Sequence, residues 1–203
     1  MVMFDSGILA LDLIQELQEE VDIAVPIADV VYCGWLNSLQ YLLYTEFIRE
    51  QRIITIQNTE GQQFEIAQFP VLTDESPVRF VDIYAVFADS VQLTKAAHSA
   101  SRIFPNTFYY DRGRLCCNTK DDFTSLTVIY FAKPALVAEE QGTITGTVAL
   151  PLEFVDMARA KLRAEAYKLA NENILAANWV NEYNVLLENF KAWIGKRAPD
   201  FEV

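Results

Sequence analysis

The 203-residue sequence has one histidine, three cysteines, seven glycines and seven prolines. So few glycines and prolines exclude low-complexity and collagen-like chains. No apolar run approaches the roughly 18–20 residues that cross a bilayer, because acidic or amide side chains interrupt each one. The first residues include acids and no basic stretch, so we expect no signal peptide and a soluble protein made in the cytoplasm. A hydrophobic content of 52% suffices for the core of one domain, or of one domain with a large insertion.

Basic residues are also scarce, and the formal net charge is −12. Residues 1–51 hold nine acidic residues and one base, Arg49. Binding to nucleic acid by bulk attraction requires a basic surface that displaces phosphate counterions, so this composition argues against it. The acids of the N-terminal third either form solvated helix faces or present a negative field to a partner.

Residue types that catalyse reactions or bind metals are few. The single histidine, His98, lies in the loop-like run KAAHSASR, and no motif supplies a nucleophile or an orienting acid for it. There is no Gly-rich phosphate loop and no spaced pair of His or Cys typical of zinc sites. Cys33, Cys116 and Cys117 are expected to be buried free thiols. The sequence predicts no catalytic, cofactor-binding or metal-ligating residues; a hydrolase based on His98 is an alternative that lacks its nucleophile.

Helical periodicity occupies both ends of the chain. We expect helices at about 6–20, 29–51, 151–170 and 173–195, because apolar residues recur there every three or four positions. Pro151 suits the first turn of the third helix, since it has no N–H group to leave unpaired. The predicted core of these helices contains Leu13, Leu17, Trp35, Leu39, Leu42, Leu162, Leu169, Trp179, Tyr183 and Phe190.

The middle of the chain, residues 52–150, has a pattern of period two rich in β-branched and aromatic residues. Strands are expected at about 52–57, 63–67, 79–88, 91–95, 107–111, 114–117 and 125–132. Short strands joined by close turns predict an antiparallel meander, sandwich or small barrel. The segment 133–150 is typical of a loop or flexible arm with one strand at 143–149.

These patterns together predict an α+β fold. Residues 1–51 and 151–203 are expected to supply the N- and C-terminal helix pairs of one helical bundle. Residues 52–150 are expected to form an inserted antiparallel β module with its arm.

Two clusters of side chains suggest binding surfaces, each with a structural alternative. Acidic residues follow the polar face of the first helix, namely Asp12, Glu16, Glu19 and Glu20. Glu16, Glu19 and Glu20, with Asp22 at the exit of that helix, suit divalent ions or paired acid and base roles, or else form a solvated face, and no Gly-centred calcium loop is present. Aromatic residues gather near Pro105, namely Phe104, Phe108, Tyr109 and Tyr110. They either stack on sugars or bases or pack in the core of the β module.

Four longer stretches follow one another along the chain. They are WLNSLQYLLYTEFIREQ (35–51), VRFVDIYAVFADSVQLTK (78–95), IFPNTFYY (103–110) and LPLEFVDMARAKLRAEAYKLANENILAANWVNEYNVLLENFKAWI (150–194). In this order they resemble a group of tailed-bacteriophage and prophage virion proteins, described as head-to-tail adaptor, connector or neck proteins. The resemblance spans most of the chain and contains no catalytic motif.

The resemblance implies a non-enzymatic structural protein of the virion, assembled in the cytoplasm of the host bacterium. It implies a homo-oligomeric ring, commonly of twelve copies, that docks beneath the portal protein at the capsid vertex and meets the next tail or neck protein. Genomic DNA passes through the central channel without sequence-specific binding, and no membrane is involved. Under this interpretation, the acidic face of Asp12, Glu16, Glu19 and Glu20 is a candidate channel lining, because like charge lets DNA slide. The alternative is a β module that binds a tail-fibre partner or a surface glycan.

Overall fold

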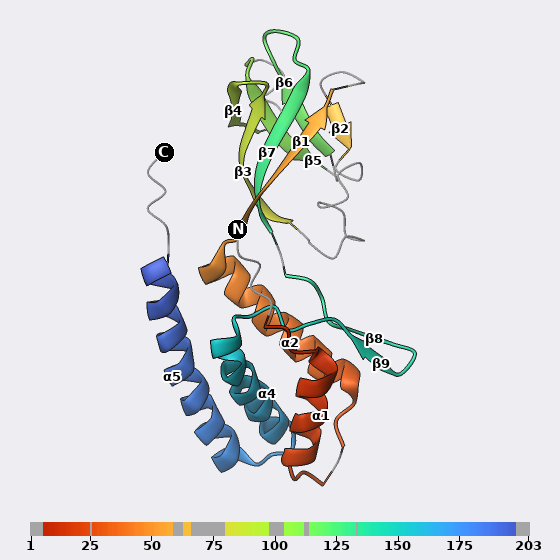
Figure 1. Ribbon diagram of the computed structural model, residues 1–203, viewed down its shortest axis with the longest axis vertical. Helices are drawn as coiled ribbons and strands as arrows, with labels where there is room; N and C mark the ends of the chain where they lie inside the picture. The colour runs from red at the N-terminus through yellow and green to blue at the C-terminus, as the bar shows by residue number, and fades with distance from the viewer. Residues whose placement is uncertain are drawn as a thin grey trace. The chain divides into compact units, whose positions relative to one another are not determined.

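The computed structural model describes residues 6–24, 26–58, 63–65, 80–97, 104–111, 114–132 and 134–197. In these residues the protein has an α+β fold, with four α-helices, a mixed β-sheet and a separate small hairpin (Figure 1). The predicted α+β class is thus confirmed. The chain divides into two compact units, here called the helical unit (1–48 with 134–203) and the β unit (49–133).

The packing of the helical unit centres on α4. The four helices are α1 (Ala10–Glu20), α2 (Asp29–Leu43), α4 (Val155–Leu169) and α5 (Asn173–Arg197). A π-helical turn, η1 (Tyr44–Ile48), continues α2, and a 3-10 turn, η3 (Leu152–Phe154), precedes α4. Helix α4 contacts α1, α2 and α5. Its buried alanines, which include Ala158, Ala160 and Ala166, let the neighbouring helices approach its backbone closely.

The second helix ends earlier than the sequence indicates. The pattern predicts a helix to residue 51, whereas α2 gives way to η1 after Leu43. The hydroxyl of Thr45 donates hydrogen bonds to the carbonyl oxygens of Tyr41 and Leu42, at 2.9 and 3.0 Å. Side-chain hydrogen bonds to these carbonyl oxygens compete with the backbone hydrogen bonds of an α-helix. Here they accompany the change from α-helical to π-helical hydrogen bonding. The chain then leaves the helix at Arg49, whose φ is 47°.

Most of the predicted core residues are buried, and two are not. Leu13, Leu17, Leu39, Leu162, Tyr183 and Phe190 are buried, and Trp35 and Trp179 are partly buried against the same core. Leu42 and Leu169 are wrong predictions, because their exposed fractions are 44% and 59%. Leu42 is turned about 120° around α2 from the buried Leu36. Leu169 is the last residue of α4, where the chain turns away.

The segment 134–150 belongs to the helical unit and not, as predicted, to the β module. It contains a hairpin of β8 (Ala138–Glu140) and β9 (Thr143–Thr145), whereas the sequence predicted one strand. The side chain of Asn37 on α2 both donates to and accepts from the backbone of Val137, at 2.7 and 2.8 Å. Four apolar residues of this segment, Val137, Ile144, Val148 and Leu150, are buried with those of the helices. The core of this unit is therefore shared between helices and a hairpin.

The β unit is one sheet with the strand order β1-β7-β3-β4-β5-β6-β2. Its strands are β1 (Gln51–Gln57), β2 (Gln63–Glu65), β3 (Phe80–Ala88), β4 (Val91–Lys95), β5 (Thr107–Asp111), β6 (Arg114–Asn118) and β7 (Ser125–Ala132). Neighbouring strands are antiparallel except β4 and β5, which are parallel, with Thr94 opposite Thr107. The prediction of a wholly antiparallel module is wrong at this pair. The connection 96–106 is long enough to bring the chain back in the same direction, and residue alternation does not reveal strand direction.

The predicted period of two is visible in β7. Leu126, Val128, Tyr130 and Ala132 are buried, and the residues between them are half-buried. The buried side joins a core with residues of β3 to β6, including Val86, Leu93, Phe108 and Leu115. One face of the sheet thus encloses the core of the β unit, and the other face remains accessible.

Candidate functional site

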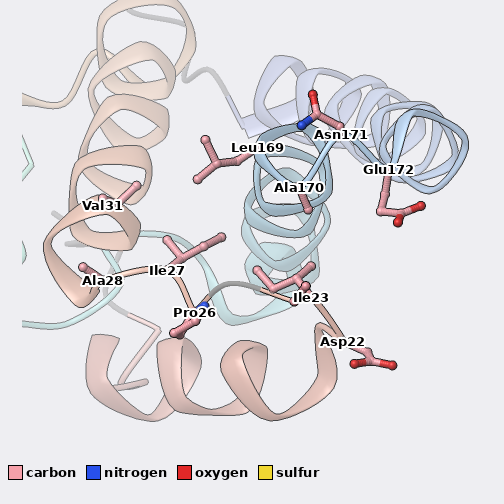
Figure 2. Close-up of a pocket in the computed structure, with 11 residues that line it drawn as sticks. Asp22, Ile23, Pro26, Ile27, Ala28, Val31, Leu169, Ala170, Asn171 and Glu172 are labelled. Atoms are coloured by element: carbon pink, nitrogen blue, oxygen red, sulfur yellow. The ribbon is translucent and has the colours of Figure 1, made fainter.

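A pocket of about 440 Å³ opens in the helical unit (Figure 2). One side consists of the α1–α2 connection, with Ile23, Pro26 and Ile27, and the other of the end of α4 and the turn into α5. That turn depends on Asn171, whose φ of 61° is a left-handed conformation that Asn adopts more readily than most residues. The described lining is mostly apolar, so the pocket suits an apolar group.

The described lining contains two carboxylates, Asp22 and Glu172. Both residues are exposed. Figure 2 shows them on one side of the pocket, with Ala28 and Val31 on the other. Acid–base catalysis requires groups whose environment matches their task, and exposed carboxylates in water are not in such an environment. The arrangement is suited to an apolar group next to a cation.

The four acidic residues predicted as one face of the first helix fall into two classes. Glu16 accepts a 2.9 Å hydrogen bond from Arg159, and Glu20 pairs with Arg163, both across the α1–α4 contact. Asp12 and Glu19 are exposed, and no ion pair is seen for them in the described part of the chain. The predicted face is therefore partly neutralised inside the molecule, and the charge presented to solvent comes mainly from Asp12 and Glu19.

The sequence contained a signal for these ion pairs that the prediction missed. Glu16 and Glu20 are four residues apart, and so are Arg159 and Arg163. Residues four apart lie on the same face of a helix, so two acids on one helix match two bases on another. The sequence signal for the pocket was weaker. The helical pattern breaks at Pro26 and at Asn171, and both residues lie in connections that line the pocket.

A second accessible surface lies on the outer face of the β unit. Tyr84 of β3 is 55% exposed, and its ring contacts that of Phe131 on β7 edge-on, with centroids 5.7 Å apart. The guanidinium of Arg49 lies 4.6 Å from the centroid of the Phe131 ring. Ile53 on the neighbouring strand β1 is also exposed. An aromatic face with a cation beside it is a typical platform for stacking.

The aromatic cluster predicted from residues 104–110 does not form one such platform. Phe104 is exposed, whereas Phe108 is buried in the core of the β unit. Tyr109 is half-buried on the same strand, and the side chain of Tyr110 lies outside the described residues. Alternation along β5 explains the opposite environments of Phe108 and Tyr109.

The three cysteines are buried free thiols, as predicted. Burial raises the pKa of Cys33, and burial followed by the charge of Cys116 raises the pKa of Cys117 to about 12. The thiols of Cys33 and Cys117 are therefore protonated at neutral pH, and thiolates are the reactive form. His98, the residue of the hydrolase alternative, lies outside the described residues.

Among the described residues, no group of three or more His, Cys, Asp or Glu side chains is arranged to hold a metal ion. The helices in that same part of the chain are all too short or too polar to cross a membrane. Comparisons of the sequence with protein-family models and with curated proteins find no match.

Proposed function

We propose that this protein is a structural subunit of a tailed-bacteriophage virion, a head-to-tail adaptor that forms a ring beneath the portal. In this proposal it acts through assembly surfaces and not through catalysis. The resemblance of four stretches across most of the chain supports the family. The surface of the helical unit supports the mode of action.

The observation that carries the proposal is the surface of α5. This helix has 25 residues, and one side of it packs on α4. The remaining surface exposes large apolar side chains, including Ile174 at 80% and Val185 at 58%, as well as Leu175 and Val180. A helix that is apolar on several sides is usually covered on several sides. Exposed apolar surface of this kind marks a contact with another protein.

In the proposed ring, the helices from the two ends of the chain form a bundle that serves as the wedge. The N-terminal pair, α1 and α2, and the C-terminal pair, α4 and α5, contribute to one apolar core. Wedges related by rotation contact each other through two different surfaces, and such contacts close into a ring. Twelve copies are the number that the resemblance implies.

In the proposed ring, acidic side chains line the DNA channel. A negative lining repels phosphate and lets the genome slide, whereas a basic lining binds it. Within α1, Asp12 and Glu19 provide this charge, because Glu16 and Glu20 are paired with arginines of α4. The contribution of α1 to the lining therefore depends on Asp12 and Glu19.

The test is to image the neck of particles that contain this protein, at a resolution where side chains are visible. We expect a ring of copies of this chain between the portal and the next tail or neck protein. A parallel assay mixes the purified protein with tailless capsids that carry the portal. If the protein binds nowhere at the vertex in either experiment, the proposed function is wrong.

A second candidate rests on the outer face of the β unit. The contact of Tyr84 with Phe131 and the adjacent Arg49 favour a binding module for a surface glycan or a tail-fibre partner. A glycan array separates the two functions. Binding of a glycan that Tyr84→Ala abolishes would support this candidate, and an array without hits would count against the glycan form of it.

A further inference from the structure

The outward side of α2 is unusual because it carries no charge. The sequence has no Asp, Glu, Lys or Arg between Asp29 and Glu46. We call the exposed residues of this side the α2 face: Val30, Gly34, Ser38, Tyr41 and Leu42. In a chain of net charge −12, an exposed helix surface of this length without charge requires an explanation.

Two hydroxyl groups on or beside the α2 face already have acceptors within the helix. The hydroxyl of Ser38 donates a 2.8 Å hydrogen bond to the carbonyl oxygen of Gly34. The hydroxyl of Thr45, at the end of the face, donates to the carbonyl oxygens of Tyr41 and Leu42. Covering this surface therefore leaves neither of these two hydroxyl groups without an acceptor, which is the main cost of burying such groups.

The α2 face also has room for another helix. A Cβ atom placed on Gly34 would have no heavy atom within 4 Å beyond its own helix. Gly34 and Ser38 are one turn apart, so two small side chains form a shallow depression between Val30 and Tyr41. Small residues at such positions let the backbones of two helices approach closely.

A second surface with little charge lies on α5. We call it the α5 face: Ile174, Asn178, Asn181 and Val185, all exposed. Between Asn173 and Leu187 the one charged residue is Glu182. Ile174 and Val185 are eleven residues apart, as are Val30 and Tyr41, so each face presents two large apolar side chains about three helical turns apart. The two faces therefore match in length and in the spacing of their apolar side chains.

We propose that the α2 face of one copy binds the α5 face of the next copy. This inference rests on the proposed ring and identifies the surfaces that join its subunits. The two faces contain different residues, so the contact is heterologous and leaves one free face of each kind for further copies. That is the property a closed ring requires.

Charge favours a second copy of this chain as the partner. Acidic residues, Asp29 and Glu46, lie just beyond both ends of the α2 face. Beyond the α5 face, that helix has one acid, Glu188, which pairs with Lys191, and two further bases, Lys196 and Arg197. This end of α5 therefore has a net positive charge, opposite in sign to the acids at the ends of the α2 face. Two α2 faces would instead bring acids together, which opposes a symmetric α2–α2 contact.

Cysteine cross-linking tests this contact in the full-length chain. One protein carries Ser38→Cys on the α2 face, and another carries Asn181→Cys on the α5 face. The native cysteines are buried, so a short bismaleimide reacts mainly with the introduced thiols. We expect cross-linked dimers when the two proteins are mixed at high concentration, and few when either is treated alone. Lys168→Cys, at an exposed position of α4 outside both faces, is the matched control for random collisions.

Gly34→Gln provides a second measurement on the same surface. The new side chain points into open space, so we expect the melting temperature of the monomer to remain the same or to rise by a few degrees, since Gly is a poor helix former. The yield of the Ser38→Cys and Asn181→Cys cross-link should fall about tenfold, because added atoms oppose a packed contact. Gln at position 34 with an unchanged yield would overturn the proposal.

The outcomes separate this inference from the proposed function. If Asn181→Cys cross-links mainly to itself, or if the mixed yield equals that of the Lys168→Cys control, the α2–α5 contact is wrong even when the protein occupies the capsid vertex. If the mixed cross-link forms but the protein is absent from the vertex, the contact stands and the adaptor function fails.

Discussion

The guanidinium of Arg159 on α4 donates a 2.9 Å hydrogen bond to the carboxylate of Glu16 on α1. A second hydrogen bond from the same guanidinium, of 2.7 Å, reaches Asp156. These carboxylates, with the Glu16 hydrogen bond as the larger cause, raise the pKa of Arg159. The pair fixes α1 on α4, so the acidic face of α1 has a structural role as well as the proposed one in the channel.

Charge reversal at two positions of α1 tests this structural role. Glu16→Lys should lower the free energy of unfolding by about 1–2 kcal/mol, because it places a cation against Arg159 and removes its acceptor. Glu19→Lys, on the exposed side of the same helix, should change it by less than about 0.5 kcal/mol. Urea unfolding of both variants checks the difference. Equal stability of the two variants would show that the Glu16–Arg159 pair contributes nothing to the packing.

Two leucines of α4 provide a test of the core. Leu162 is fully buried and Leu169 is largely exposed beside the pocket. Leu162→Ala should lower the free energy of unfolding by about 2–5 kcal/mol, through lost burial and a residual cavity. Leu169→Ala removes the same atoms from a largely exposed site and should cost less than about 1 kcal/mol. Chemical denaturation of both proteins measures the contrast, and a cost for Leu169→Ala near that for Leu162→Ala would mean that this leucine is covered in solution.

Much of the fold follows from local patterns. The stripes of Leu13, Leu17 and Leu162 predicted buried helix faces, because a period of 3.6 residues places them on one side of each helix. The alternation in β7 predicted one buried and one accessible side of a strand for the same kind of reason. Asn171 marks the turn between the last two helices, as the break in the pattern indicated.

The remainder depends on contacts between residues distant in the chain. Alternation within β4 and β5 contains no information on their relative direction, so their parallel pairing was missed. The segment 134–150 was assigned to the β module because it looks like an arm, yet hydrogen bonds from Asn37, about a hundred residues earlier in the chain, hold it in the helical unit. The neutralised acids of α1 depend in the same way on arginines of α4.

The thiols should be unreactive in the folded protein. Cys117 has a pKa of about 12, and burial raises that of Cys33, so thiolate is scarce at mildly alkaline pH. At about pH 8, a thiol reagent such as DTNB should react with far less than one equivalent per chain within minutes. In denaturant all three thiols should react. Rapid reaction of the native protein would mean that at least one cysteine is accessible.

The carboxylate of Asp89 gives the β unit a defined dependence on acid. Asp89 follows β3 in the turn to β4, with a φ of 50°. It accepts hydrogen bonds from the N–H and hydroxyl groups of Thr124 and Ser125, which precede and begin β7. These bonds, with that from the backbone N–H of Thr124 as the largest cause, lower the pKa of Asp89 from 3.8 to about 2. The turn is thereby tied to a strand that lies beside β3 in the sheet.

Because the folded state favours the charged form, Asp89 stabilises the fold above its unfolded pKa of 3.8, and this contribution is lost as the pH falls towards about 2. Asp89→Asn tolerates the same left-handed backbone but cannot ionise. The wild type should therefore be more stable than Asp89→Asn at about pH 5, and the gap should narrow steadily as the pH falls from about 4 to about 2. Urea unfolding of both proteins across this range measures the gap. Thr124→Val removes one of the donors, so the difference in stability between this variant and the wild type should change less with pH than the difference for Asp89→Asn. If the difference for Asp89→Asn stays constant down to the lowest pH, these hydrogen bonds do not favour the carboxylate.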